Sequence, residues 1–193
     1  TSIRKQWSYH LHKILYKLFL SNRFTCTSPL NGTTNEYSFA GIKSKNLNVI
    51  TSQYAKSNYF YDLHYGIFTE GEATEISGSI YRMFRIKDEG IVLCKGKLDI
   101  SGSLFLNCRI NAVHVLKNQT TAIKATTFII NDQIINNNLH TAIKIDEFLP
   151  NSTTNITTSI NATLNWSRFG EKIIGIHLQG NKVAGGCDIK VTN

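Results

Sequence analysis

Residues 88–111 read DEGIVLCKGKLDISGSLFLNCRIN, and this stretch carries the clearest structural signal in the chain. Apolar and polar residues alternate along it with the period of two that is typical of β-strands. We therefore predict two strands joined by the turn around Gly102. The residues expected to face a core are Val92, Cys94, Leu98, Ile100, Leu104, Leu106, Cys108 and Ile110.

The same alternation continues toward the C-terminus. It predicts a strand over 156–166 with Ile156, Ile160, Leu164 and Trp166 inward, and a final hairpin from 174–178 to 187–191 across Gly180 and Asn181. Further runs at 59–68, 78–86, 122–130 and 141–148 bring the total to about eight strands, with no convincing helix between them. This pattern predicts an all-β fold, an antiparallel jelly-roll sandwich or a comparable two-sheet sandwich.

A segment of different character precedes these strands. Residues 3–20 carry apolar side chains at steps of three and four, which predicts an amphipathic helix over about this range. Its apolar face comprises Ile3, Trp7, Leu11, Ile14, Leu15, Leu18 and Phe19. Beyond it we expect an extended connector with one short strand at 47–51. The predicted organisation is a basic N-terminal arm over 1–58 and a β domain over 59–193.

The charge is concentrated in the first third of the chain. Residues 1–60 hold eight basic residues and one acidic residue, Glu36, and so account for +7 of the formal net charge of +8. This asymmetry is typical of an arm that meets a polyanion or an acidic surface, although a solvated basic terminus has the same composition. The residues expected to anchor the arm on nucleic acid or a partner are Arg4, Lys5, Trp7, Leu11, Lys13, Leu15, Lys17 and Arg23.

Residues that could carry chemistry are scattered. The six histidines show no metal-binding spacing, and no phosphate-binding loop or nucleophile elbow occurs. Glu70, Glu72 and Glu75 form one acidic group, and Asp146 and Glu147 form another. Paired acids can carry out glycoside hydrolysis, but a calcium site or plain loop solvation is at least as plausible. We therefore expect no enzyme activity, no catalytic residue, no metal and no cofactor.

The four cysteines, Cys26, Cys94, Cys108 and Cys187, lack C-x-x-C spacing, which effectively excludes a zinc ribbon. We expect reduced, buried thiols, and a bridge between Cys94 and Cys108 is the alternative.

No run of 18 apolar residues occurs, and Lys13 and Lys17 interrupt what would be the apolar part of a signal peptide.

Six glycosylation sequons begin at Asn31, Asn118, Asn151, Asn155, Asn161 and Asn165. Asn155, Asn161 and Asn165 share the outward parity of one predicted strand. Glycosylation of these three is geometrically permitted, but nothing in the sequence requires it.

The order of the predicted strands resembles a known family. The stretches 88–100 and 103–111 look like the central strands of the tumour-necrosis-factor and complement-globular-head jelly rolls. FGEKIIGIHLQ at 169–179 and GGCDIKV at 185–191 are similar to their last two strands. Similar jelly rolls serve as viral capsid and penton subunits, often with a basic N-terminal arm.

The resemblance implies a structural subunit of a virus capsid or similar particle, located in the virion. Its partners would be copies of itself in a trimer, pentamer or larger shell, neighbouring virion proteins, and nucleic acid through residues 1–60, with no membrane contact expected. The alternative is a secreted or surface trimeric head that binds a receptor or a glycan.

Overall fold

The computed structural model describes residues 22–26, 39–51, 57–72, 74–131, 139–163, 172–180 and 187–192. All regular secondary structure in these ranges is β-strand. The helix predicted over 3–20 lies outside them. Across the described ranges, no helix has the length and apolar character needed to span a membrane.

The described ranges contain thirteen strands. They are β1 (Arg23–Thr25), β2 (Ala40–Lys45), β3 (Val49–Ile50), β4 (Asn58–Tyr61), β5 (Tyr65–Glu70), β6 (Thr74–Ser79), β7 (Tyr81–Phe84), β8 (Glu89–Ser101), β9 (Leu104–Leu106), β10 (Asn111–Asn131), β11 (Leu139–Thr163), β12 (Lys172–Leu178) and β13 (Cys187–Thr192). Every pairing between described strands is parallel. The chain is all-β as expected, but the antiparallel jelly-roll sandwich is wrong.

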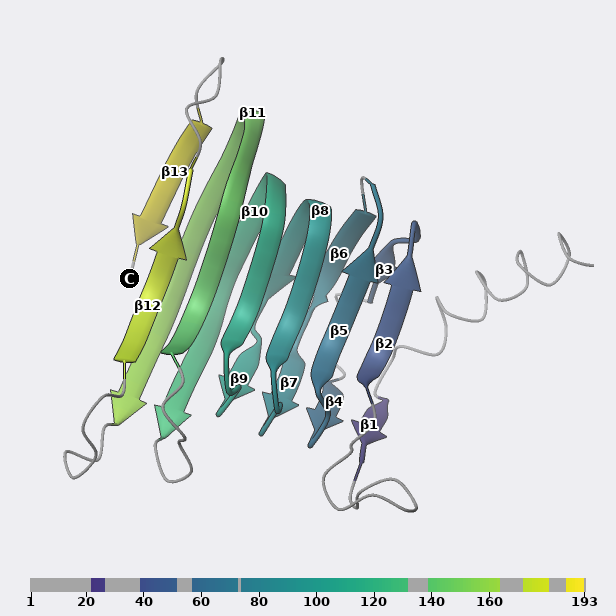
Figure 1. Ribbon diagram of the computed structural model, residues 1–193. Coiled ribbons are helices and arrows are strands. Elements are labelled where there is room, and N and C mark those ends of the chain that lie inside the picture. The colour runs from purple at the N-terminus through teal and green to yellow at the C-terminus, as the bar shows by residue number, and fades with distance from the viewer. Residues whose placement is uncertain are drawn as a thin grey trace, which may run out of the picture.

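The chain instead winds as a parallel β-helix, in which each coil stacks on the one before (Figure 1). Coil 1 holds β1, β2 and β3, and coil 2 holds β4, β5 and β6, which pair with them in that order. Coil 3 holds β7 and β8. Coil 4 begins with β9, and the long strands β10 and β11 then run round the corners from one coil to the next.

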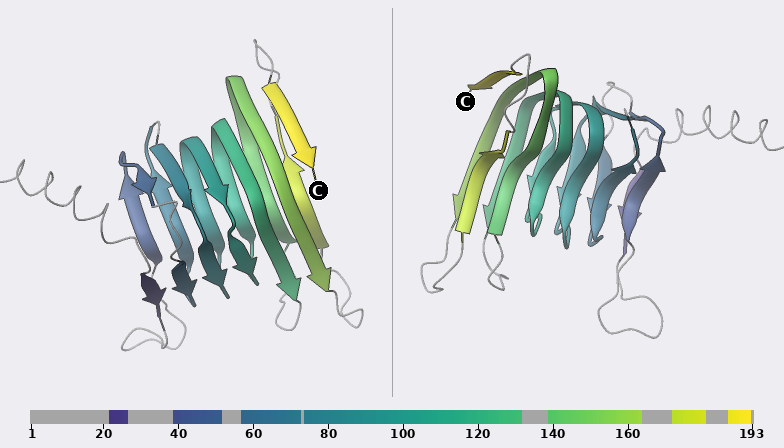
Figure 2. Two further views of the ribbon diagram at one scale, coloured as in Figure 1. Left: turned by 180° about the vertical axis from the view of Figure 1, so that it is seen from behind. Right: turned by 45° about the horizontal axis from the view of Figure 1, so that its top comes forward.

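Three ladders of strands form three faces, which the turned views of Figure 2 separate. The first face comprises β1, β4, β7, β9 and the ends of β10 and β11. The second comprises β2, β5, the first halves of β8, β10 and β11, and β12. The third comprises β3, β6, the later parts of β8, β10 and β11, and β13.

The corners of the coils repeat a backbone conformation. Asp62, Arg85 and Asn107 follow the first face in three successive coils, with φ of 54°, 52° and 55°. Such left-handed residues turn the chain sharply without ending its pairing with the next coil. The Asp62 amide donates to Phe84 O and the Arg85 amide to Leu106 O, at 3.3 and 2.9 Å. The corners therefore stack as the strands do.

The core consists of columns in which one inward side chain per coil lies on its equivalent in the next. The first face contributes Phe60, Met83, Phe105 and Phe128, each at most 1% exposed. The rings of Phe105 and Phe128 stack with centroids 5.0 Å apart. The second face contributes Ile67, Ile91, Val113 and Ile143, all fully buried. Because the whole interior is made of such columns, each coil is held by its two neighbours.

The inward faces predicted for 88–111 are wrong in three places, one of which is Ile110, 37% exposed between β9 and β10. On β8 it is Leu93 that lies in the core, while Val92 is buried on the outer side between Phe68 and His114. Gly96, with φ of 132°, then bends the strand and shifts the alternation, so Leu98 and Ile100 face inward as predicted. On β9 the core residue is Phe105, and its neighbours Leu104 and Leu106 are half-exposed.

The inward and outward positions predicted at the start of 156–166 are confirmed where the structure describes them. Ile156 is fully buried, Ile160 packs against the core, and Asn155 and Asn161 are exposed. Leu164 and Trp166 lie outside the described residues. β12 and β13 form no hairpin, because both pair in parallel with β11.

Candidate functional site

The strands of the second face bend at a small residue. On β5, Tyr65 and Phe68 point outward, while Gly66 and Ile67 both point inward. A Cβ atom at Gly66 would lie 2.5 Å from the carbonyl oxygen of Gly90, so only glycine fits this bend. Because two consecutive residues turn inward, the outward side chains on either side of the bend converge.

Three aromatic rings meet across this bend at the N-terminal end of the face. Phe39, Tyr65 and Phe68 contact one another with centroid distances of 4.9 to 5.5 Å. Phe39 is 49% exposed, an unusual position for a large apolar side chain beside two others. Lys43 Nζ lies 5.2 Å from the centre of the Phe39 ring, and it also pairs with Glu70 at 2.8 Å.

A chain of charged groups continues along the same face over the next three coils. His114 Nδ1 lies 2.7 Å from Glu89 Oε1, and His114 Nε2 lies 2.7 Å from Asp146 Oδ2. Asn111 Nδ2 donates to the same Glu89 oxygen. Lys144 Nζ lies 3.0 Å from the other oxygen of Asp146. These side chains come from β8, β10 and β11, three neighbouring strands of one ladder.

The two carboxylates beside the ring affect the protonation of His114. A neutral imidazole has one N–H donor and one acceptor nitrogen, so it satisfies only one of two flanking carboxylates. Desolvation of the ring lowers the pKa of His114, but the hydrogen bonds and charges of Glu89 and Asp146 outweigh it, and the net pKa is raised. The two carboxylates therefore favour the cationic form of the imidazole.

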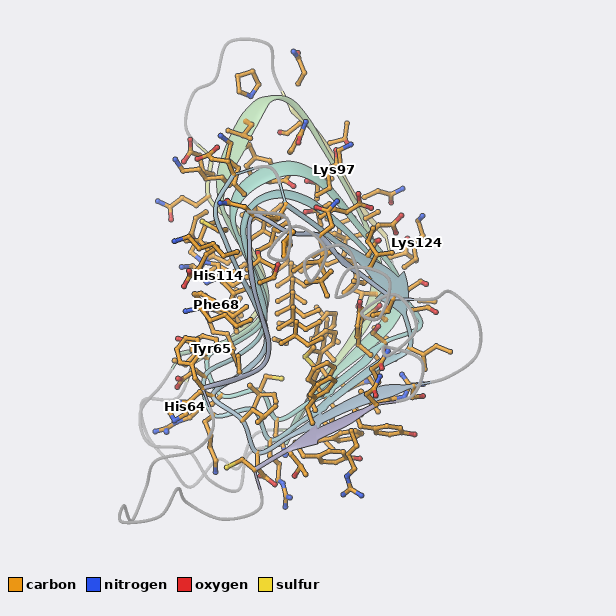
Figure 3. The ribbon with its side chains drawn as sticks, turned by 90° about the vertical axis from the view of Figure 1, so that its right-hand side faces the viewer. His64, Tyr65, Phe68, Lys97, His114 and Lys124 are labelled. Atoms are coloured by element: carbon orange, nitrogen blue, oxygen red, sulfur yellow. The ribbon has the colours of Figure 1, made fainter. Side chains whose placement is uncertain are left out.

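The aromatic and charged groups are contiguous. Burial of the Tyr65 hydroxyl raises its pKa, and the nearby carboxylates of Asp88 and Glu89 raise it further. Asp88 Oδ2 in turn lies 2.7 Å from His64 Nδ1. Figure 3 shows His64, Tyr65, Phe68 and His114 along one side of the coils, with Lys97 and Lys124 on another side. We call the following residues the second-face strip: Phe39, Lys43, Tyr65, Phe68, Glu89, Asn111, His114, Lys144 and Asp146.

Most residues proposed from the sequence for the anchoring arm lie outside the described part of the chain. Arg23 alone is described. It is exposed at the start of β1, with its guanidinium 5.0 Å from the centre of the Tyr61 ring on the first face. Arg23 is not part of the strip, so the anchoring residues and the strip have no described residue in common.

The sequons divide by exposure. Asn155 and Asn161 are exposed on β11, whereas Asn165 is outside the described residues. Asn118 is fully buried, where it donates to Thr154 Oγ1 at 2.9 Å and accepts from Thr121 Oγ1 at 2.8 Å. This asparagine belongs to an internal hydrogen-bonded network.

Cys94 and Cys108 are free thiols, so they are not bridged to each other. Burial raises the pKa of Cys108 to about 12, which keeps this thiol protonated and unreactive. Among the described residues, no three His, Cys, Asp or Glu side chains are placed to hold a metal ion. The Asp146 carboxylate of the strip faces a histidine and a lysine instead.

The described residues thus define a class of protein, a parallel β-helix with an aromatic and charged strip on one face. No known protein family, characterised protein or solved structure matches the chain. In particular, no match connects it to the jelly-roll families that its strand pattern resembles.

Proposed function

We propose that this chain is a structural subunit, a β-helical rod that assembles with copies of itself through the last described coil, which holds β12 and β13. The observation that carries the proposal is that the core columns continue into this coil but are poorly covered there. Ile176 and Leu178 stand in register with the buried Ile143 and Ile145, yet both are only half-buried. Val191, in register with Ile156, is 48% exposed.

The first coil differs from the last. Its core residues Ile42 and Val49 are 9% and 4% exposed, so the apolar interior is covered at that end. Among the described strands, β12 and β13 pair with β11 alone, and each has an edge without a partner. An unpaired edge next to exposed core side chains favours pairing with another chain. Two copies related by a two-fold axis would present the same edge to each other.

The basic N-terminal segment adds a second element to this proposal. The sequence predicts that residues 1–60 anchor the subunit on nucleic acid or on neighbouring proteins, as in a virus particle. If phosphates are the partner, the logarithm of the binding constant should fall by nearly one for each phosphate contact per tenfold rise in salt. Binding that does not change with salt would contradict the nucleic-acid part and leave assembly through the last coil untouched.

The deciding experiment is the native mass of the full chain, measured by light scattering at several concentrations. We expect a multimer that the substitution Val191→Lys converts to monomer, because the new charge lies where the columns would meet. Ile110→Lys is the matched control, since Ile110 is 37% exposed but lies between β9 and β10, away from the last coil. A wild-type monomer at all concentrations, or equal multimers in both variants, would contradict the proposal.

The rival function, a secreted or surface binding head, has one observation in its favour. Asn155 and Asn161, both in sequons, are exposed on the third and first faces. Intact mass of chain made in a secretory host, before and after deglycosylation, separates the two functions.

A further inference from the structure

We propose that the second-face strip binds an uncharged carbohydrate chain. This inference goes beyond the structural role and does not depend on it, since the strip and the last coil are separate parts of the rod. It is carried by the juxtaposition of one exposed aromatic ring, Phe39, and two half-buried ones, Tyr65 and Phe68, with hydrogen-bonding groups along one face.

The aromatic end provides a surface for the apolar face of a sugar ring. The C–H groups on that face carry slight positive charge, and an aromatic ring has a negative face, so the two pack favourably. Phe39 is the most accessible ring, and Tyr65 and Phe68 hold it in place at 4.9 and 5.5 Å. Lys43 already occupies the cation position near Phe39 and Phe68, so a cationic ligand would meet a like charge there.

The neighbouring coils provide acceptors and donors for sugar hydroxyls. Glu89 Oε1 accepts hydrogen bonds from both Asn111 and His114. The other carboxylate oxygen of Glu89 has no partner among the described residues. A carboxylate oxygen in this position accepts a hydroxyl hydrogen. Lys144, whose side chain is 27% exposed, has donors beyond the one that faces Asp146.

The charge of the strip selects against ionic ligands. Each cation has an anion beside it, Lys43 with Glu70, His114 with Glu89, and Lys144 with Asp146, at 2.8, 2.7 and 3.0 Å. A polyanion such as nucleic acid requires unpaired positive charge, which these pairs do not offer. Polar groups whose charges are paired with one another can still form hydrogen bonds with neutral hydroxyls.

The length of the strip indicates a chain of sugars. It runs from Phe39, beside β2, to Asp146 on β11. The strands between them pair in the order β2, β5, β8, β10 and β11, which makes four steps. At about 4.8 Å a step, this distance is roughly 19 Å along the axis of the rod. A single sugar would reach the aromatic rings or the charged groups, whereas an oligosaccharide would reach both.

The test is titration calorimetry of the full chain with neutral oligosaccharides of gluco, manno and galacto configuration, and with heparin as an anionic probe. We expect at least one neutral oligosaccharide to bind, and to bind about tenfold more weakly to Phe39→Ala. Phe39→Tyr should restore binding because it keeps the ring. Leu47→Ala is the matched control, since Leu47 is 52% exposed in the same coil but outside the strip.

Three outcomes would overturn the proposal. The first is that no neutral oligosaccharide binds the folded wild-type chain. The second is that binding is unchanged in Phe39→Ala while circular dichroism shows an intact fold. The third is that heparin binds and the neutral oligosaccharides do not. None of them bears on the native mass, so this inference and assembly through the last coil fail or succeed separately.

Discussion

His114 on β10 reaches Asp146 on the next coil, with 2.7 Å between Nε2 and Oδ2. The other nitrogen of the same ring binds Glu89 on the preceding coil. One side chain thereby links three turns of the β-helix on the outside, where the core columns do not reach. The link depends on the protonation of the ring.

Stability should fall as the pH rises above 6.5, through the folded pKa of His114. The folded pKa of His114 is above its ordinary value of 6.5, so the imidazolium contributes in full below that value and its contribution is lost as the pH rises through the folded pKa. Desolvation raises the pKa of Asp146, but its bonds to His114 and Lys144 outweigh this, so its contribution is lost when the pH falls below the ordinary range. Urea unfolding as a function of pH measures both limits.

Substitution of the ring tests the assignment of this pH dependence. His114→Gln leaves Glu89 without its cation and Asp146 with Lys144 alone, and it should lower the free energy of unfolding by about 1–3 kcal/mol near pH 6. The decline with rising pH should also become smaller. His64→Gln, on the same face, should keep the decline. An identical pH profile in His114→Gln would show that other groups set it.

A second prediction distinguishes the observed core from the one read from the sequence. Phe105→Ala removes a fully buried ring that stacks on Phe128 and should cost about 3–5 kcal/mol. Leu104→Ala, at the adjacent half-exposed position, should cost roughly 1 kcal/mol. Denaturant unfolding of both variants measures the difference. The reverse order would support the inward set predicted for an antiparallel sandwich.

A third prediction concerns the bend in β8. Gly96→Ala would place a Cβ atom 1.9 Å from the carbonyl oxygen of Thr74, at φ of 132°, so we expect a loss of more than about 3 kcal/mol or a failure to fold. Gly102→Ala is the control, because its Cβ would lie 4.0 Å from the nearest atom and its φ of 55° costs roughly 1 kcal/mol. Thermal melts of the two variants check the order.

A fourth prediction concerns sugar attachment. In a secretory host, Asn151, Asn155 and Asn161 are the described sequons that a glycan can occupy on the folded chain, and the buried Asn118 is not. Peptide mapping by mass spectrometry after expression identifies occupied sites. A glycan on Asn118 would mean that this asparagine is accessible, contrary to its hydrogen bonds with Thr121 and Thr154.

The all-β class was predictable because the alternation of apolar and polar residues with a period of two is a property of the strand itself. The direction of pairing was not, because parallel and antiparallel strands share this period. The distinguishing signal is a repeat of a small residue and a β-branched residue: Gly41-Ile42, Gly66-Ile67, Gly90-Ile91, Ala112-Val113, Ala142-Ile143 and Gly175-Ile176. These pairs are the bends of the second face. Their spacing ranges from 22 to 33 residues, so no fixed period reveals them.

The faces were misassigned where the backbone departs from regular alternation. A strict period of two carried from Leu98 back through Gly96 puts Cys94 and Val92 inward, whereas the bend at Gly96 puts Leu93 there. The sequence alone does not predict which glycine will adopt a positive φ. The same uncertainty affected Leu104, where Phe105 is the core residue.

The strip could not be found from spacing along the chain. Glu89, His114 and Asp146 are separated by 25 and 32 residues, and the stacking of coils brings them together. The signal in the sequence is indirect: Glu89 immediately precedes the pair Gly90-Ile91, whereas His114 and Asp146 follow the pairs Ala112-Val113 and Ala142-Ile143. Once the repeat is recognised, these residues fall on one face.

The stacking of coils gives the molecule a graded resistance to opening. Interior coils are bonded on both sides, whereas the last described coil is bonded through β11 alone. Hydrogen exchange should therefore be slowest for amides of β8 and β10 and fastest for those of β12 and β13. A protease would shorten the rod from this end, one turn at a time, and each remaining turn would keep its own fold.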